Sequence, residues 1–374
     1  MMPPADSAGF EPPPYPYDRL APLREAAQRH EGGCVDLSIG TPCDPPPAAV
    51  VAALGASDLE RSYPLSVGSD AYRRAACAWM QRRLGVTVEP EHVGACVGTK
   101  ELVAGLPHWL RLRAPHRDTV LYPAVSYPSY EMGAILAGAR AVPVPMDAQW
   151  RIDLDAIDDA DAARALCLWV NTPGNPAGGL DDLGAAAAWG RAHDVPVFSD
   201  ECYVEFTWDG PRHTILEHGS AGVVAVHSLS KRSNLAGVRA GVFAGDPDLV
   251  HYLREVRKHA GFMVPGPVQA AAAVAWGDDE HVEDQRTRYH QRLVRLREIL
   301  AELDIPCDLP GGGFYLWPEA PDGDAWALAR RLAEDLGVLG SPGEFYGAAG
   351  ARHLRLAVVA PDAAIELLAE RVAR

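Results

Sequence analysis

Short apolar runs alternate with longer stretches of helical periodicity between residues 71 and 270. The runs have the length of buried strands, and the stretches between them, such as residues 130–138 and 183–193, have the spacing of amphipathic helices. This alternation is typical of βαβ units and predicts an α/β fold with a mostly parallel central sheet. The predicted strands are residues 119–122, 141–144, 165–170, 195–198 and 223–226. Polar residues directly follow two of these strands, and in open α/β sheets ligands bind beyond the carboxyl ends of strands.

The pattern differs on both sides of this region. Before it, residues 1–18 predict an irregular arm, because the prolines at 12–14 and 16 disfavour a helix. A short helix over 20–30, a strand over 35–39 that ends at Gly40 and a helix over 45–59 follow. After it, a helix over 285–302, a Gly-rich turn at 311–313, a strand at 314–317, a helix at 325–336 and a strand at 353–358 predict a smaller α+β domain.

These patterns predict three parts of the chain. Residues 1–44 form an N-terminal arm together with part of the small domain. Residues 45–275 form a large ligand-binding domain, and residues 276–374 form the small C-terminal domain.

Composition and charge exclude several classes of protein. The chain has 374 residues, and its 50 Asp and Glu against 34 Lys and Arg leave a formal net charge of −16, which argues against a nucleic-acid-binding surface. Seven scattered cysteines without a CxxC pair indicate neither a disulfide framework nor a metal site. The Pro-rich N-terminus lacks the apolar segment of a signal peptide, and no run reaches the ~18 apolar residues that span a membrane. We expect a cytoplasmic protein with reduced thiols and no membrane contact.

The segment Ser228-Leu229-Ser230-Lys231 carries the clearest chemistry. It follows a predicted strand, and Arg239 lies a few residues further along the chain. A lysine amine can form a Schiff base with an aldehyde, and hydroxyls and a guanidinium are good phosphate ligands. Aldehyde and phosphate together describe pyridoxal 5'-phosphate. The alternative is a surface lysine in a Ser-rich loop.

Two further motifs follow predicted strands. Asn175 lies in a Pro- and Gly-rich turn that can hold its amide against a ligand oxygen, although the turn can also simply join a strand to a helix. Asp200 can keep a pyridine nitrogen protonated, and Tyr203 can donate a hydrogen bond to the ring oxygen of the same cofactor. The alternative for Asp200 is a helix N-cap.

Three other positions are candidates with simpler alternatives. Gly98, Thr99 and Lys100 can open a helix whose N–H groups bind phosphate, or can merely cap that helix. Tyr127 can stack on a cofactor ring or belong to the core. Arg355 lies in an apolar strand and needs an anionic partner, which can be a substrate carboxylate or a structural acid.

Taken together, these motifs resemble fold-type I pyridoxal-phosphate-dependent aminotransferases of class I and II, from about residue 35 to the C-terminus. The resemblance implies the fold-type I transferase architecture and assigns catalysis to Lys231, Asp200 and Tyr203. It places the pyridine nitrogen at Asp200, the ring oxygen at Asn175 and Tyr203, and a stacked ring at Tyr127. It implies a substrate α-carboxylate held by Arg355 with Gly40 and Asn175. The implied phosphate ligands are Gly98, Thr99, Lys100, Ser228, Ser230 and Arg239.

The same resemblance implies a homodimer with shared active sites. Tyr63-Pro64, with Gly68 and Arg73, is similar to the segment whose tyrosine reaches the phosphate in the neighbouring subunit. Two residues depart from the family pattern, Tyr72 in place of an aliphatic residue and Ala177 in place of Thr or Ser. Neither departure touches the expected chemistry.

Several phrases are similar to actinobacterial N-succinyldiaminopimelate aminotransferases of lysine biosynthesis. They include residues 35–42, 98–102, 199–203, 227–231, 257–261, 264–269 and 342–347. The similarity implies amino transfer between glutamate and N-succinyl-LL-2,6-diaminopimelate, whose distal end we expect to meet the N-terminal arm or residues 257–267.

Other functions on the same scaffold stay open. They are an aminotransferase of aspartate-like specificity or of secondary metabolism, and a β-eliminating lyase. A pyridoxal-phosphate-sensing domain of a transcription regulator is disfavoured by the acidic charge.

Overall fold

A computed structural model describes residues 10–56 and 58–374. Its centre is a seven-stranded sheet of order β2-β8-β7-β6-β5-β3-β4, in which β8 runs antiparallel to both neighbours and every other pairing is parallel. The predicted mostly parallel sheet is therefore confirmed. Its strands are β2 (Val93–Cys96), β3 (Thr119–Pro123), β4 (Arg140–Val144), β5 (Ala165–Asn171), β6 (Val197–Asp200), β7 (Val223–Ser228) and β8 (Gly241–Gly245).

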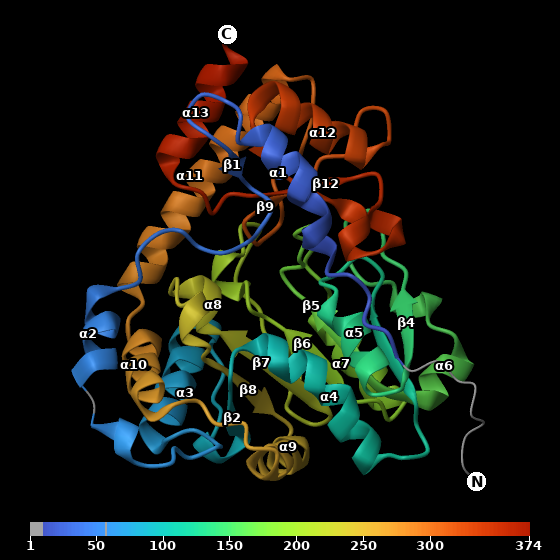
Figure 1. Ribbon diagram of the computed structural model, residues 1–374. Coiled ribbons are helices and arrows are strands. Elements are labelled where there is room, and N and C mark those ends of the chain that lie inside the picture. The colour runs from blue at the N-terminus through green and yellow to red at the C-terminus, as the bar shows by residue number, and fades with distance from the viewer. Residues whose placement is uncertain (1–9, 57) are drawn as a thin grey trace.

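Helices cover both faces of this sheet. Successive residues of a strand point to opposite faces, and in these strands the residues on both faces are apolar. In β7, Val224 and Val226 belong to the cluster packed by α4, α5 and α9, whereas Val223 and Ala225 belong to the cluster packed by α2, α3, α7 and α10. Figure 1 shows the sheet between these two layers. The helices are α2 (Ala48–Ala56), α3 (Asp70–Leu84), α4 (Thr99–Arg113), α5 (Ser129–Leu136), α6 (Asp159–Arg164), α7 (Leu183–Ala192), α8 (Leu229–Arg232), α9 (Pro247–His259) and α10 (Gly266–Gly277).

A second core joins the two ends of the chain, in the upper part of Figure 1. Strand β1 pairs parallel with β10, and β11, β12 and β9 form an antiparallel sheet. The strands are β1 (Val35–Asp36), β9 (Tyr315–Leu316), β10 (Val338–Leu339), β11 (Ser341–Pro342) and β12 (Leu354–Ala357). The helices of this part are α1 (Ala21–Ala27), α11 (Glu280–Glu302), α12 (Ala325–Leu336) and α13 (Asp362–Val372).

Short 3-10 helices connect these elements. They are η1 (Pro16–Leu20), η2 (Leu59–Arg61), η3 (Pro90–His92), η4 (Leu154–Ala156), η5 (Val204–Phe206), η6 (Ile215–His218), η7 (Ala236–Val238), η8 (Gly343–Tyr346) and η9 (Ala348–Gly350).

Two local predictions were wrong. Pro16 does not extend the irregular arm but begins η1, because proline lacks only an N–H that the first turn leaves unpaired anyway. The strand predicted over residues 35–39 ends at Asp36. There the Asp36 carboxylate accepts hydrogen bonds from the backbone N–H and the hydroxyl of Ser38, and such local side-chain bonds compete with a sheet ladder.

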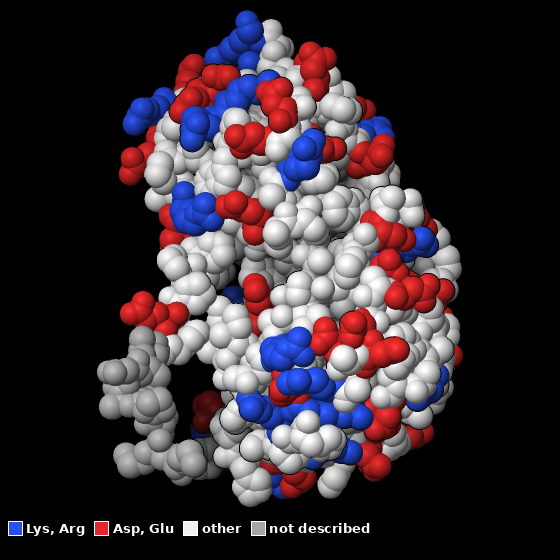
Figure 2. Space-filling view, turned by 90° about the vertical axis from the view of Figure 1, so that its right-hand side faces the viewer, with Lys and Arg blue, Asp and Glu red and all other residues white. Residues whose placement is uncertain are grey.

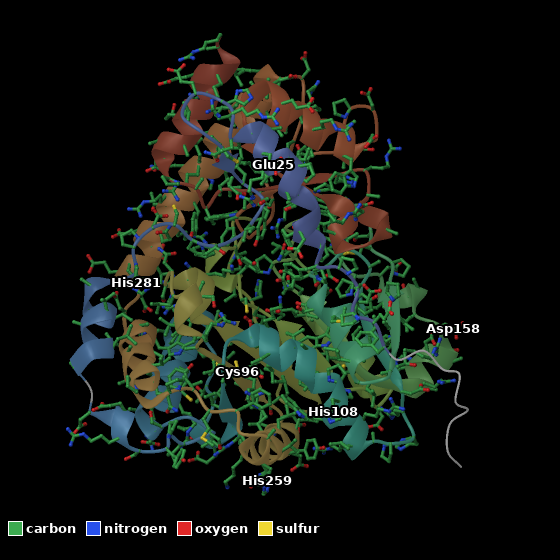
Figure 3. All side chains as sticks on the ribbon, in the orientation of Figure 1. Glu25, Cys96, His108, Asp158, His259 and His281 are labelled. Atoms are coloured by element: carbon green, nitrogen blue, oxygen red, sulfur yellow. The ribbon has the colours of Figure 1, made fainter. Side chains whose placement is uncertain are left out.

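The surface and the cysteines complete the description. On the face shown in Figure 2, basic side chains are interspersed with acidic ones. All seven cysteines are free thiols, and Cys96, labelled in Figure 3, is buried at the end of β2. Over residues 10–56 and 58–374, no helix combines the length and apolar character needed to cross a membrane. The same residues contain no cluster of three or more His, Cys, Asp or Glu side chains suited to a metal ion.

Candidate active site

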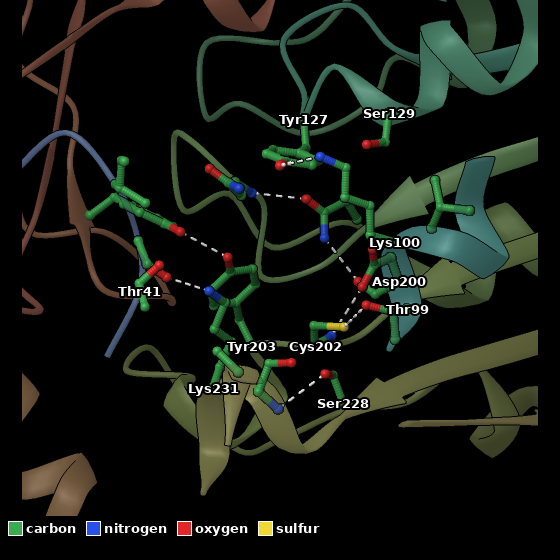
Figure 4. Close-up of a pocket in the computed structure, with 18 of the residues that line it drawn as sticks. Thr41, Thr99, Lys100, Tyr127, Ser129, Asp200, Cys202, Tyr203, Ser228 and Lys231 are labelled. Atoms are coloured by element: carbon green, nitrogen blue, oxygen red, sulfur yellow. Dashed lines mark hydrogen bonds between the residues drawn. The ribbon is translucent and has the colours of Figure 1, made fainter. Parts of the chain in front are cut away.

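A cavity of about 430 Å³ lies where the carboxyl ends of β5, β6 and β7 face the second core (Figure 4). The structure brings twelve of the predicted site residues together in its lining. They are Gly40, Thr99, Lys100, Tyr127, Asn175, Asp200, Tyr203, Ser228, Ser230, Lys231, Arg239 and Arg355.

Lys231 lies in α8, directly after β7. The hydroxyl of Ser228 caps this short helix by accepting a 3.1 Å hydrogen bond from the N–H of Ser230. The Lys231 Nζ donates to the carbonyl of Gly40. Burial, reinforced by the nearby Arg355 charge, lowers the pKa of the Lys231 amine to about 8, so a larger fraction is neutral near pH 7 than for an exposed lysine. A neutral amine is the form that attacks an aldehyde.

The chain has only three lysines, Lys100, Lys231 and Lys258. Lys258 lies on the surface, where its Nζ is 3.5 Å from the carboxylate of Glu255. Only Lys100 and Lys231 line the cavity, and of these two Lys100 is exposed whereas Lys231 is half-buried and donates to the carbonyl of Gly40.

Asp200 ends β6 and is held by two hydrogen bonds. The hydroxyl of Tyr130 donates to its Oδ2 at 2.8 Å, and the N–H of Cys202 donates to its Oδ1 at 3.2 Å. Burial raises the pKa of the Asp200 carboxyl, and these hydrogen bonds oppose that rise. Within the described part of the chain no Lys or Arg nitrogen lies within 4.0 Å of it. A cavity-lining carboxylate without a cationic partner suits a cationic ring nitrogen on a ligand.

Arg355 lies in β12 and is 1 % exposed. Its Nη1 donates to the Asn175 Oδ1 at 2.9 Å, and its Nη2 donates to the carbonyl of Ser38 at 2.5 Å. Asn175 is itself held by a 2.9 Å hydrogen bond from its N–H to the Asn171 Oδ1. These hydrogen-bond partners are neutral and do not balance the guanidinium charge, so the site suits a ligand carboxylate.

Donors suited to phosphate gather on another side of the cavity. They are the hydroxyls of Thr99, Ser228 and Ser230, the guanidinium of Arg239 and the amino end of α4. Gly98, just before α4, has a φ of 71°, and a Cβ there would lie 2.1 Å from the Arg239 Nη2. The backbone conformation at position 98 therefore favours glycine, and a larger residue would displace the Arg239 guanidinium.

The side chain of Lys100 points to the rings of Tyr15 and Tyr127 at the cavity. Its Nζ donates to the Tyr127 hydroxyl at 3.2 Å (Figure 4). It also lies 5.3 Å from the ring centroids of both Tyr127 and Tyr15. Such distances are typical of cation–π contacts. Burial raises the pKa of Tyr15 to about 12, so its hydroxyl stays protonated.

Two predicted site residues, Gly98 and Tyr63, and the segment 257–267 do not line the cavity within one chain. Tyr63 is 96 % exposed and is absent from the lining of the cavity within one chain. Arg257 is buried, donates to Glu101 at 2.9 Å and does not line the cavity. Of the two segments expected to meet a distal substrate group, only the arm reaches the cavity in a single chain, through Tyr15 and Tyr17.

Sequence reasoning missed several residues of the cavity. Tyr203 donates to, or accepts from, the hydroxyl of Tyr315 at 2.8 Å, and Tyr17 makes a 3.2 Å hydrogen bond with Arg355. The Tyr-Pro-Ser-Tyr and Gly-Gly-Gly-Phe-Tyr phrases contain Tyr130 and Tyr315, but nothing local indicates which tyrosine faces the site. The missed residues are Tyr15, Tyr17, Ile39, Thr41, Val103, Ser129, Tyr130, Asn171, Cys202, Ala236 and Tyr315.

The site as a whole fits pyridoxal phosphate. The Lys231 amine, whose pKa is lowered, matches its aldehyde, the Asp200 carboxylate matches its ring nitrogen, and the hydroxyl and guanidinium donors match its phosphate. The chemistry of the donors, rather than any one motif, makes this match.

Comparisons with known proteins agree with this geometry. Residues 33–372 match the family model described as aminotransferase class I and II. The chain is 42 % identical to the 4-dedimethylamino-4-oxo-anhydrotetracycline transaminase OxyQ of Streptomyces rimosus, over 96 % of this chain and 99 % of OxyQ. It is 40 % identical to "Probable aminotransferase Rv1178" of Mycobacterium tuberculosis, over 94 % of this chain and 82 % of that protein. The structure of a "probable N-succinyldiaminopimelate aminotransferase" from Thermus thermophilus superposes with a TM-score of 0.85 at 29 % identity, over 95 % of this chain and 98 % of that one.

Proposed function

The chain belongs to the class I and II aminotransferase family, and on that premise we propose that it moves an amino group between glutamate and a second amino acid, with N-succinyl-LL-2,6-diaminopimelate as the candidate second substrate. The protein is a pyridoxal-phosphate-dependent transaminase of fold type I, as the family match and the solved structures establish. The substrate pair is the proposed part. The observation that carries the proposal is a single cavity that holds the amine of Lys231, the carboxylate of Asp200 and the buried guanidinium of Arg355.

When bound, pyridoxal phosphate supplies an electron sink for the negative charge that develops at the substrate Cα. In our proposal Lys231 carries the cofactor and later moves the Cα proton, a task suited to an amine whose pKa is lowered to about 8. Asp200 keeps the ring nitrogen protonated, while Tyr203 and Asn175 face the ring oxygen and Tyr127 stacks on the ring. Gly98, Thr99, Ser228, Ser230 and Arg239 hold the phosphate, and Lys100 contributes its backbone N–H at the start of α4.

Charge in the cavity supports acidic substrates. The lining contains four basic side chains, Lys100, Lys231, Arg239 and Arg355, against one carboxylate, Asp200, although the whole chain carries a net charge of −16. In our proposal the cofactor phosphate pairs with Arg239. The substrate α-carboxylate pairs with Arg355, next to Gly40 and Asn175. In this arrangement the Lys100 ammonium can pair with a second acidic group of the substrate, which glutamate and N-succinyldiaminopimelate both carry.

The exposed segment around Tyr63 supports a homodimer. Tyr63 is 96 % exposed, and Leu59 and Leu65 nearby are 45 % and 60 % exposed. Large apolar side chains gathered on a surface are typical of an interface. We propose that a second copy covers them and that Tyr63 completes the partner's phosphate site. We also propose that residues 45–275 and 276–374 act as separate domains, with residues 1–44 contributing the arm and part of the small domain.

Single-turnover spectroscopy tests the proposal. The holoenzyme is mixed with one amino acid at a time, without a keto acid, and the absorbance of the bound cofactor is followed. We expect glutamate and N-succinyldiaminopimelate to convert it and 2-oxoglutarate to restore it after glutamate. Release of ammonia and pyruvate from an amino acid without any keto acid would instead identify a β-eliminating lyase, and no conversion by any amino acid would refute the amino transfer.

A second candidate rests on the 42 % identity to OxyQ over nearly the full length of both chains. That relative acts, by its name, on an oxo-anhydrotetracycline. If glutamate converts the cofactor but N-succinyldiaminopimelate does not, an acceptor of secondary metabolism becomes the better proposal. The same assay therefore decides between the two.

A further inference from the structure

Tyr315 touches both functional halves of the cavity. It lies in β9, next to the strand that carries Arg355, and the two strands are antiparallel with Ala357 opposite Tyr315. Its side chain is 2 % exposed and lines the cavity. This position places one tyrosine between a residue proposed for the cofactor and a residue proposed for the substrate.

The ring of Tyr315 packs on the guanidinium of Arg355. The Cζ of Arg355 lies 4.3 Å from the centroid of the Tyr315 ring and 4.7 Å from that of the Tyr346 ring. Flat aromatic faces restrict the plane of a guanidinium and attract its charge. The direction in which Arg355 presents its N–H groups therefore depends on these rings.

The hydroxyl of Tyr315 makes the other contact, at 2.8 Å from the hydroxyl of Tyr203. Gly40 makes room for it, because a Cβ at position 40 would lie 2.1 Å from the Tyr315 oxygen. The carbonyl of Gly40 in turn accepts from Lys231, so the hydroxyl pair lies close to the amine.

Each hydroxyl has one proton, which fixes the direction of this pair. If Tyr203 donates its proton to the ring oxygen of the cofactor, Tyr315 must be the donor to Tyr203. A hydroxyl that accepts a hydrogen bond becomes a stronger donor. Tyr315 then strengthens the bond that Tyr203 makes.

We propose, on the basis of the function proposed above, that Tyr315 is a positioning residue with two separable contacts. Its ring face orients Arg355 toward the substrate carboxylate, and its hydroxyl orients and polarises Tyr203. The first contact needs only an aromatic ring, whereas the second needs only the hydroxyl.

Two substitutions separate these contacts. Tyr315→Phe keeps the ring and removes the hydroxyl, and Tyr315→Leu removes both. Binding of succinate, a carboxylate without an amino group, reports on Arg355, and a pH titration of the absorbance of the bound cofactor reports on Tyr203. Tyr346→Phe is the matched control for the titration, because its hydroxyl contacts Tyr17 and not Tyr203. Thermal melting checks that each variant is folded.

We expect Tyr315→Phe to bind succinate within about twofold of the wild type, and Tyr315→Leu to bind it about tenfold more weakly. Both variants should raise the pH midpoint of the cofactor titration, because a weaker donor at Tyr203 stabilises the deprotonated cofactor less, whereas Tyr346→Phe should leave the midpoint in place. Unchanged midpoints in both variants, or equal loss of succinate binding in both, would overturn the inference. Failure of the wild type to react with any amino acid would refute the proposed function instead, because neither succinate binding nor the cofactor titration depends on turnover.

Discussion

The hydroxyl of Tyr130, at the start of α5, donates a 2.8 Å hydrogen bond to the Oδ2 of Asp200, at the end of β6. Tyr130 is 2 % exposed and packs on Trp169, with 5.3 Å between the ring centroids. The hydroxyl therefore has little freedom to turn away. It stabilises the ionised form of a carboxyl whose pKa is raised by burial.

We predict that Tyr130→Phe raises the pKa of Asp200 further, because the carboxylate loses a donor. Asp200 then becomes protonated at a higher pH as the solution is acidified, so the acid limb of the pH dependence of kcat/KM moves to higher pH. Near neutral pH, kcat/KM should fall about tenfold. The control is Tyr122→Phe, a tyrosine of the same apolar cluster that does not line the cavity. An acid limb that stays in place in Tyr130→Phe would contradict the prediction.

The attachment of the cofactor should depend on pH through Lys231. Since its pKa is lowered to about 8, the fraction of reactive neutral amine is half-maximal near that pH and levels off above it. We expect the rate at which apoprotein takes up pyridoxal phosphate to follow the same curve. A midpoint near 10 would indicate an ordinary exposed lysine.

Lys231→Ala should bind pyridoxal phosphate without a covalent bond and should be inactive. Lys100→Ala, the other lysine of the cavity, should keep a covalent adduct that borohydride fixes on Lys231. Peptide mapping after reduction locates the adduct. An adduct on Lys100 or Lys258 in the wild type would refute the assignment.

Arg355→Lys should slow both half-reactions, because both substrates present an α-carboxylate to the same side chain. Lysine keeps the charge but loses the two-pronged hydrogen bond and the packing on Tyr315 and Tyr346. We expect a loss of about 1–3 kcal/mol of transition-state stabilisation in each half-reaction, measured by single-turnover kinetics. Arg352→Lys, an exposed residue paired with Glu319, is the control. If only one half-reaction slows, Arg355 is not shared by the two substrates.

The role of Tyr63 can be tested by exchanging subunits between two inactive proteins. A hybrid of Lys231→Ala and Tyr63→Ala should contain one intact site, with Lys231 from one chain and Tyr63 from the other. Random exchange should then restore about a quarter of the wild-type sites. Each variant taken alone through the same procedure is the control. An active monomer, or no recovery although hybrids form, would argue against shared sites.

Local patterns in the sequence were sufficient for five of the seven strands of the central sheet, all but β2 and β8, and for part of the site. The alternation of apolar runs with helical stretches depends on neighbouring residues, so it predicted strands β3 to β7. Asp200, Asn175 and Lys231 were found because each ends a strand or follows one closely, and the carboxyl ends of parallel strands meet at one edge of a sheet. Predicting that these three residues lie in one cavity therefore required no information about contacts between distant segments.

Only the tertiary structure decided which other side chains complete the site. Tyr130 meets Asp200 across 70 positions of sequence, Tyr203 meets Tyr315 across 112, and Arg355 meets the carbonyl of Ser38 across 317. The start of η1 at Pro16, and with it the approach of Tyr17 to Arg355, was likewise set by packing of the arm against the second core. Local sequence specifies backbone conformation and the pattern of burial, whereas the partner of a buried hydroxyl or guanidinium depends on which distant segments pack together, because an unpaired polar group is costly in the interior.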